Sequence, residues 1–214
     1  MVEIVELAIN LVGLAISAMI GRFAYSGYAT IVSPNLLRLT LAFASIAVGF
    51  GLIIGSLFAP LDYSQAIDTA GLAAQAVGYF FIAMSHGLKS SFDFAPKGSA
   101  ALVLVPLATT GFVIPGNSIE HLVRSISFIL LVYVSIETLA SYMQTMRTNT
   151  LMIGSGLGTL AVAELLAWYD FIFPGTFSYP ALAAKVAGFG LMFIPYSKFG
   201  LASGFGRRIK QDAE

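Results

Sequence analysis

The sequence has no cysteine, two histidines and one tryptophan, and only 10% of its residues are charged. Without cysteine the chain can form no disulfide, no thiolate metal site and no cysteine nucleophile. Its 11 basic and 11 acidic residues cancel, so it lacks the basic surface by which proteins hold nucleic acid. Soluble domains carry about 25% charged residues, and this chain has too few to cover its surface in water.

The residues that are present are mostly apolar. Hydrophobic residues make up 57% of the chain, and its mean hydropathy is +0.86. This composition predicts an integral membrane protein whose main partner is the lipid bilayer. The first residues include Glu3 and Glu6 rather than the positive charges that open a signal peptide, so we expect the first apolar stretch to be retained.

Seven stretches are apolar over the roughly 20 residues that a helix needs to cross a bilayer. Polar breaks rich in proline, glycine, asparagine or aspartate separate them, as expected for chain that leaves the hydrocarbon. The sequence therefore predicts an all-α membrane protein, a single domain over 1–214 with seven transmembrane helices. The predicted spans are 4–25, 35–58, 66–88, 98–115, 120–144, 149–169 and 178–197.

Basic residues are unevenly divided between the two sides of this topology. Arg124 stands alone on one side, Lys185 lies within the last span, and the other side holds Arg22, Arg38, Lys89, Lys97, Arg147, Lys198, Arg207, Arg208 and Lys210. Because cytoplasmic loops are enriched in lysine and arginine, we expect an outer N-terminus and a cytoplasmic tail, 198–214. We also expect a plasma-membrane location.

Two pairs of segments match one another along the chain. NLLRLTLAFASIAVGFGL begins at Asn35 and NTLMIGSGLGTLAVAELL at Asn149, an offset of 114 residues; LAAQAVGYF (72–80) and LAAKVAGFG (182–190) match at an offset of 110. The match predicts a 3+1+3 parallel repeat, with repeat A at 4–88, a linker helix at 98–115 and repeat B at 120–197. A rotation near 180° about the membrane normal would then place Asn35 on Asn149 and Gln75 on Lys185. Chance similarity between apolar helices is the alternative.

This layout resembles SWEET-type sugar transporters, which are also three-plus-one-plus-three, although none of the prolines here is followed by the glutamine of the Pro-Gln motif. The segment AAKVAGFGLMF is similar to the retinal-binding helix of microbial rhodopsins, a resemblance that implies a Schiff base on Lys185. The third span has no central acid to serve as a counterion, and Lys185 lies close to the outer end of its span.

Ionisable residues inside the predicted spans are the candidate polar site. Such groups are costly in lipid and commonly mark functional positions. Glu164 and Lys185 lie at equal distances from the turn between the last two spans, so we expect them to form a buried salt bridge. The candidate site comprises Glu164, Lys185, Glu137 and Gln75.

We expect no catalytic residues, metal ligands or cofactor. His86 and His121 lie at opposite ends of their spans, too far apart to ligate one haem, and no cluster of metal ligands is evident. No serine, histidine and aspartate set lies at one depth, so the chain is not expected to be an enzyme.

Pairs of small residues four apart predict close helix packing. These pairs are Gly51 with Gly55, Ala74 with Gly78, Gly154 with Gly158, and Ala184 with Gly188.

Two kinds of function remain open at this point. Short loops and the lack of a soluble domain favour a sensor-type or accessory subunit, either with other membrane subunits or as a homo-oligomer. The alternative is a small-solute or ion transporter with a site between the two repeats, and a retinal protein using Lys185 is a more remote one.

Overall fold

The computed structural model describes residues 2–87 and 118–211, with side chains over 4–85, 119–170 and 172–197. These residues form six helices and no strand. The helices are α1 (Val2–Ile31), α2 (Pro34–Ser56), α3 (Leu61–Gly87), α5 (Ser118–Thr145), α6 (Thr148–Ile172) and α7 (Ser178–Gln211). The predicted span 98–115 lies outside the described residues.

Five of the helices contain segments long and apolar enough to cross a membrane: Ile4–Ile31, Pro34–Ser56, Leu61–Ser85, Ile119–Thr145 and Thr148–Asp170. The six predicted spans that fall within the described residues are helical, and most of these helices are longer than expected. The span predicted at 178–197 is the first part of α7, which continues into the tail as far as Gln211 and contains Pro195. This segment is not among the five, because Lys185 and several polar residues lower its mean hydropathy.

The α1–α2 and α5–α6 connections have the same geometry. Val32 and Met146 both adopt the left-handed conformation, with φ of 52° and 51°. Each donates its backbone N–H to the carbonyl of a tyrosine four residues earlier, Tyr28 or Tyr142, at 2.7 Å. A left-handed residue with such a bond is a common way to end a helix. The next helix starts directly afterwards, and Pro34 occupies the first turn of α2, where its missing N–H costs nothing.

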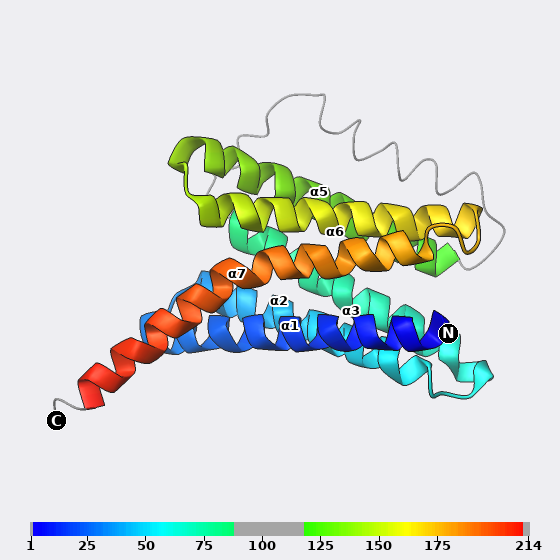
Figure 1. Cartoon of the computed structure of the whole chain (residues 1–214), viewed down its shortest axis with the longest axis horizontal. Coiled ribbons are helices and arrows are strands. Elements are labelled where there is room, and N and C mark those ends of the chain that lie inside the picture. The colour runs from blue at the N-terminus through cyan, green and yellow to red at the C-terminus, as the bar shows by residue number, and fades with distance from the viewer. Residues whose placement is uncertain (1, 88–117, 212–214) are drawn as a thin grey trace.

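The helices run lengthwise beside one another, with the chain termini at opposite ends (Figure 1). Among the described helices, each has two close backbone neighbours, so that they form a closed ring in the order α1, α2, α3, α5, α6, α7. Side chains of α2 and α7 meet inside this ring, where the ring centroids of Phe50 and Phe189 are 5.4 Å apart.

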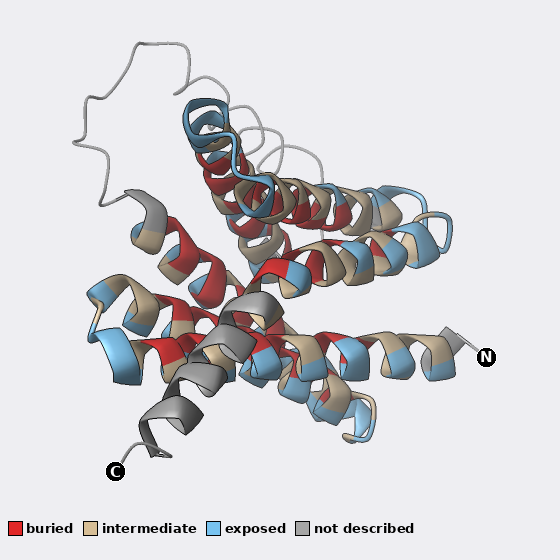
Figure 2. Ribbon diagram, turned by 60° about the vertical axis from the view of Figure 1, so that its left-hand side comes forward, coloured by how far each residue is buried: buried red, intermediate tan, exposed pale blue. Residues whose placement is uncertain are grey.

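Buried faces turn inward, and the outer helix faces carry exposed apolar residues (Figure 2). Val48, Ile136 and Val162 lie in the middle of their helices and are each about half exposed. Exposure of such an apolar surface to water is unfavourable, whereas contact with lipid tails is not. The long apolar helices and this apolar exterior are those of an integral membrane protein.

Small residues bring two pairs of helices into backbone contact, as the small-residue patterns predicted. A methyl group on Gly78 would lie 2.7 Å from the carbonyl oxygen of Ala42, and one on Gly188 would lie 2.9 Å from that of Gly156. Gly154 and Gly158 likewise lie against Leu139 and Ser135 of α5, where the Ser135 hydroxyl donates to the Gly154 carbonyl at 2.9 Å.

The prediction was wrong for Gly51 and Gly55. Neither has any neighbouring atom within 4 Å of the position of an added methyl group. Both lie on the face of α2 that points away from the other described helices, so their spacing serves no contact among the described residues.

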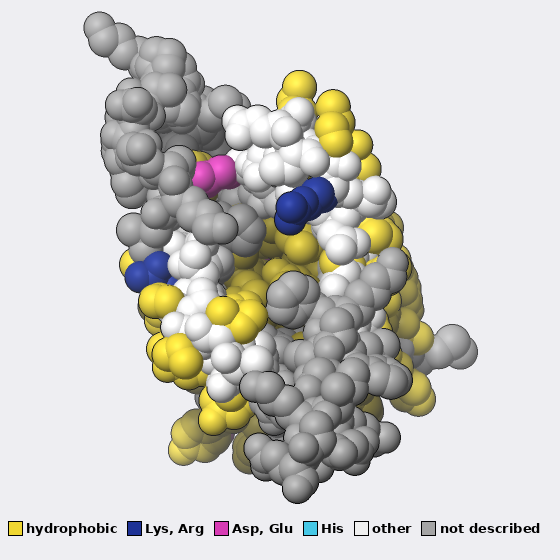
Figure 3. All heavy atoms as spheres, turned by 90° about the vertical axis from the view of Figure 1, so that its left-hand side faces the viewer, with side chains coloured by type: hydrophobic (Ala, Val, Ile, Leu, Met, Phe, Trp, Pro, Cys, Tyr) yellow, Lys and Arg dark blue, Asp and Glu magenta, His cyan; other side chains and the backbone are white. Residues whose placement is uncertain are grey.

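Charges differ between the two ends of the bundle. Arg38 in the first turns of α2 and Arg147 between α5 and α6 lie at the end where α1 and α5 finish. Figure 3 views the molecule from that end, where basic side chains and an acidic one are visible. At the opposite end α3 and α5 begin with Asp62 and Glu120 in their first turns.

Candidate functional site: a charged cavity between the helices

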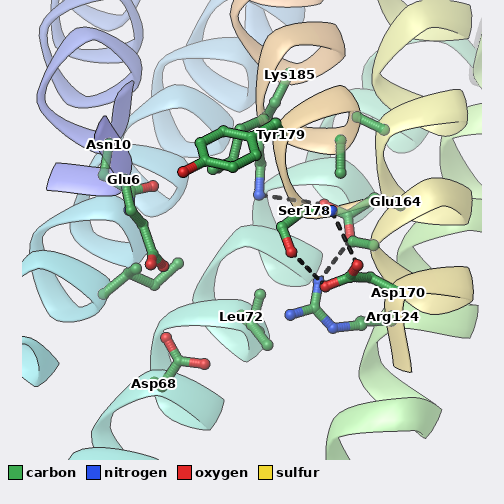
Figure 4. Close-up of a pocket in the computed structure, with 15 residues that line it drawn as sticks. Glu6, Asn10, Asp68, Leu72, Arg124, Glu164, Asp170, Ser178, Tyr179 and Lys185 are labelled. Carbon is green, nitrogen blue, oxygen red and sulfur yellow. Dashed lines mark hydrogen bonds and ion pairs between the residues drawn. The ribbon is translucent and has the colours of Figure 1, made fainter. Parts of the chain in front are cut away.

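An ion-pair network connects three helices near the end of the bundle where α7 begins. Lys185 Nζ lies 3.3 Å from Glu164 Oε1, and Arg124 Nη1 lies 3.6 Å from Glu164 Oε2 (Figure 4). Glu164 is only 3% exposed. The predicted salt bridge between Glu164 and Lys185 is therefore confirmed in its geometry, and Glu164 has a second cationic partner.

Arg124 is the member of the network that sequence reasoning missed. From the sequence, Arg124 is placed only as a lone basic residue on the outer side. In the structure it lies six residues after the start of α5, and its side chain lines the cavity inside the bundle. Glu120, one helical turn earlier, holds it with a contact of 3.0 Å. The available signal was that Glu120 and Arg124 are four residues apart on one helix, a spacing that places opposite charges side by side.

The network forms one wall of a cavity of about 280 Å³. Every described helix contributes to it, and Figure 4 shows Glu6, Asn10 and Asp68 across the cavity from Arg124, Glu164 and Lys185. The lining residues are Glu6, Asn10, Ile53, Asp68, Leu72, Arg124, Ala163, Glu164, Ala167, Asp170, Ser178, Tyr179, Ala181, Leu182 and Lys185. Four carboxylates and two cations thus face a space large enough for a small molecule.

Asp170 shapes the cavity by fixing the turn between α6 and α7. Its Oδ1 accepts hydrogen bonds from the backbone N–H groups of Phe177 and Ser178 at 2.7 and 2.9 Å, and its Oδ2 accepts from the Ser178 hydroxyl at 2.6 Å. A carboxylate in this position satisfies N–H groups that the first turn of α7 leaves unpaired, and it complements the helix dipole.

We expect Asp170→Ala to lower the free energy of unfolding by about 1–2 kcal/mol, the usual cost of losing a helix cap. Amide hydrogen exchange should also become faster at the start of α7, because two of its N–H groups lose their acceptor. Thr176→Ala, an exposed change in the same turn, is the matched control. Equal exchange in the two variants would show that the carboxylate does not hold the turn.

The other two predicted site residues, Gln75 and Glu137, do not line the cavity. Gln75 is 1% exposed on α3, and neither of its side-chain amide atoms has a hydrogen-bond partner in the structure. Glu137 lies 13 residues beyond Arg124 on α5, roughly 20 Å along the helix. Lys185 Nζ also lies 5.4 Å from the centre of the Phe50 ring.

Aromatic rings close the bundle beyond Lys185. The Phe50 and Phe189 rings pack edge to face, and the Phe43 and Tyr196 rings do the same at 5.7 Å. Phe189 and Tyr196 follow Lys185 along α7, so these ring pairs lie in succession from the cavity toward the far end. Two packed aromatic ring pairs therefore lie between the cavity and that end.

No cluster of three or more histidine, aspartate or glutamate side chains in the described part of the chain is placed to hold a metal ion. Comparisons of the chain with protein-family models, with curated proteins and with solved structures gave no match. The fold and site define the class, a helical integral membrane protein with a charged internal cavity, and any more specific function must be argued from that cavity.

Proposed function

We propose that this protein is a non-enzymatic membrane transporter that carries a small solute through the cavity between its two halves. The observation that carries the proposal is the cavity itself, which has charged walls contributed by both halves and aromatic pairs closing one end. A transporter needs a central binding site that opens to one side of the membrane at a time. A cavity at one end of the bundle with packed rings beyond it matches one such state.

The proposal includes the 3+1+3 repeat, which several structural correspondences support. Val32 and Met146 are 114 residues apart and end their helices with the same bond. Gly78 packs on Ala42 as Gly188 packs on Gly156, which reproduces offsets of 114 and 110. In the ring of helices, each contact of one half has a counterpart in the other.

The repeat explains why the cavity lies where it does. With the same offsets, four pairs of matched positions line it from opposite halves: Asn10 with Arg124, Ile53 with Ala167, Asp68 with Ser178, and Leu72 with Leu182. A space bordered by matched positions of both halves lies on the axis that relates them. Rocking of one half against the other about this axis is the movement that would transfer a solute.

We further propose a plasma-membrane protein with an outer N-terminus and a cytoplasmic C-terminus, because arginine and lysine gather at the end opposite the cavity. In intact cells, Asp212→Cys should resist a membrane-impermeant thiol reagent, whereas Leu61→Cys at the α2–α3 connection should be labelled. The chain has no cysteine of its own to interfere. Labelling at position 212 with protection at position 61 would reverse the orientation.

Access to the cavity from both sides tests the transport proposal. We expect Ala167→Cys, which lines the cavity, to react with an impermeant thiol reagent in right-side-out and in inside-out vesicles. Ala161→Cys lies on the same helix, is 3% exposed and does not line the cavity, so it should stay unlabelled in both.

The sensor or accessory-subunit hypothesis predicts another result. A fixed cavity would let Ala167→Cys react from one side only, and native mass spectrometry after mild-detergent purification would find a stable heteromeric assembly. That combination would overturn the transport proposal. A retinal protein would instead need the Lys185 amine for a Schiff base, whereas here the amine lies in an ion pair.

A further inference from the structure

Polar side chains from five helices meet at one level of the cavity. Asn10, Asp68, Arg124 and Lys185 each lie six to eight residues after the start of their helix, and Glu164 lies eight residues before the end of α6. These five helix ends are at the same end of the bundle (Figure 1). At about 1.5 Å per residue the five side chains start from similar depths, and all five line the cavity.

The charges at this level balance, because two of the five residues are carboxylates and two are cations. The other two carboxylates of the cavity lie outside this level: Glu6 is one helical turn nearer the start of α1, and Asp170 is bound to the first turn of α7. A solute with a net charge would add an uncompensated charge to a space of low dielectric, which is costly. A solute with one group of each sign would not.

Asn10 is the uncharged member of this level, and its side chain points to a ligand. It is only 3% exposed and lines the cavity. No side chain or backbone group in the described part of the chain forms a hydrogen bond with its amide. Buried polar groups in proteins nearly always have partners, and an amide can both donate and accept. A polar group of a bound solute would supply the missing partner.

The remaining hydrogen-bonding capacity is divided between two walls. Asn10 and Lys185 lie on α1 and α7, which are neighbours in the ring of helices. The Lys185 ammonium group has three N–H donors, and its ion pair with Glu164 leaves donors for a further partner. Asp68 lies across the cavity from Lys185 (Figure 4) and forms no ion pair with any side chain that the structure describes. Donors therefore face an acceptor carboxylate across the same space.

We propose that the cavity binds a small zwitterion, with its carboxylate held by Lys185 and Asn10 and its ammonium group held by Asp68. This inference rests on the proposed transport function and names its substrate class. Hydrogen bonds between charged groups at both ends are stronger than neutral ones. A cavity of about 280 Å³ has room for a short carbon chain between the two ends. Glu164 does not contact the solute in this scheme, and it holds Lys185 in place.

The test uses the full-length protein in lipid nanodiscs and isothermal titration calorimetry. The probes are glycine, β-alanine and 4-aminobutyrate, three zwitterions that differ in the spacing of their charges. Propylamine and propionate have the three carbons of β-alanine but only one charged group each. We expect at least one zwitterion to bind at least about tenfold more tightly than either of them, because each lacks one charge-assisted contact. Binding of no zwitterion, or equally tight binding of propylamine or propionate, would overturn the inference.

Asn10→Leu tests the carboxylate end, because leucine replaces the amide by an apolar group of similar size. Affinity for the tightest zwitterion should fall by about tenfold or more. The melting temperature should stay level or rise, since a buried amide without a partner is removed. Asn149→Leu, the same substitution at an exposed position of α6, should alter neither. Unchanged affinity in Asn10→Leu would show that the carboxylate is not bound there.

Asp68→Asn tests the ammonium end. It should weaken binding of the zwitterion by about tenfold or more and should not weaken binding of propionate, which has no ammonium group. Asp62→Asn, an exposed change on the same helix, is the matched control. Unchanged zwitterion affinity in Asp68→Asn would overturn the assignment.

The two proposals can fail separately. Two-sided labelling of Ala167→Cys without zwitterion binding would refute the substrate class and leave transport standing. One-sided labelling with zwitterion binding would refute transport and support the binding site.

Discussion

Replacing Glu164 by glutamine should lower the free energy of unfolding by about 3–5 kcal/mol, the usual cost of removing one partner of a buried ion pair. The substitution leaves Lys185 facing Arg124 inside the bundle with no carboxylate between them. Arg124 keeps Glu120, at 3.0 Å, whereas Lys185 Nζ loses the carboxylate that lies 3.3 Å from it. Chemical unfolding in mixed detergent micelles gives the measurement.

Two related variants should lose less stability than Glu164→Gln. Lys185→Met alone should cost less than Glu164→Gln, because Glu164 keeps Arg124 as a partner at 3.6 Å. The double variant should recover much of the loss, because it removes both members of the 3.3 Å pair together. Glu137→Gln is the matched control, a carboxylate of α5 that is distant from the network. If Glu164→Gln and Lys185→Met are additive, the two charges are not coupled.

The proposed repeat offers a comparison that supports this order. The positions that match Arg124, Glu164 and Lys185 at the same offsets are Asn10, Phe50 and Gln75, which are all uncharged. A network of mutually dependent charges is expected to be present or absent as a whole. Phe50 meets Phe189 across the bundle and Lys185 approaches its ring, so the uncharged half fills the corresponding space with apolar contacts.

Much of this arrangement could be predicted from local sequence. Helix positions followed from apolar length, and the Glu164–Lys185 pair followed from equal distances to one turn between consecutive helices. Arg124 could not be placed in the same way, because it comes from a helix separated from Lys185 by the whole of α6. Which face of α5 turns inward depends on packing between distant segments, and the period of apolar residues is weak when lipid also accepts them.

The glycines also show that spacing in the sequence does not by itself predict which helices come into contact. Gly49 was not part of any predicted motif, yet it lies in close backbone contact with α3. A methyl group there would be 2.6 Å from the carbonyl oxygen of Gly71 and 2.6 Å from Gln75 Cγ. Gly51 and Gly55 have the spacing of a packing motif but open surroundings. Spacing indicates that a close approach is possible, and the neighbouring helix decides whether it occurs.

Gly49→Ala should therefore destabilise the protein by about 1–3 kcal/mol, the range for overpacking a tight interior. The obstacle includes backbone atoms of α3, so relief requires the two helices to separate rather than one side chain to move. Gly51→Ala is the matched control two residues away: the same methyl group meets nothing within 4 Å, and the better helix propensity of alanine should leave stability unchanged or raise it by up to about 1 kcal/mol.

Chemical unfolding of the two variants under the same conditions gives the measurement. If Gly49→Ala is as stable as Gly51→Ala, α2 and α3 are not in backbone contact at this level.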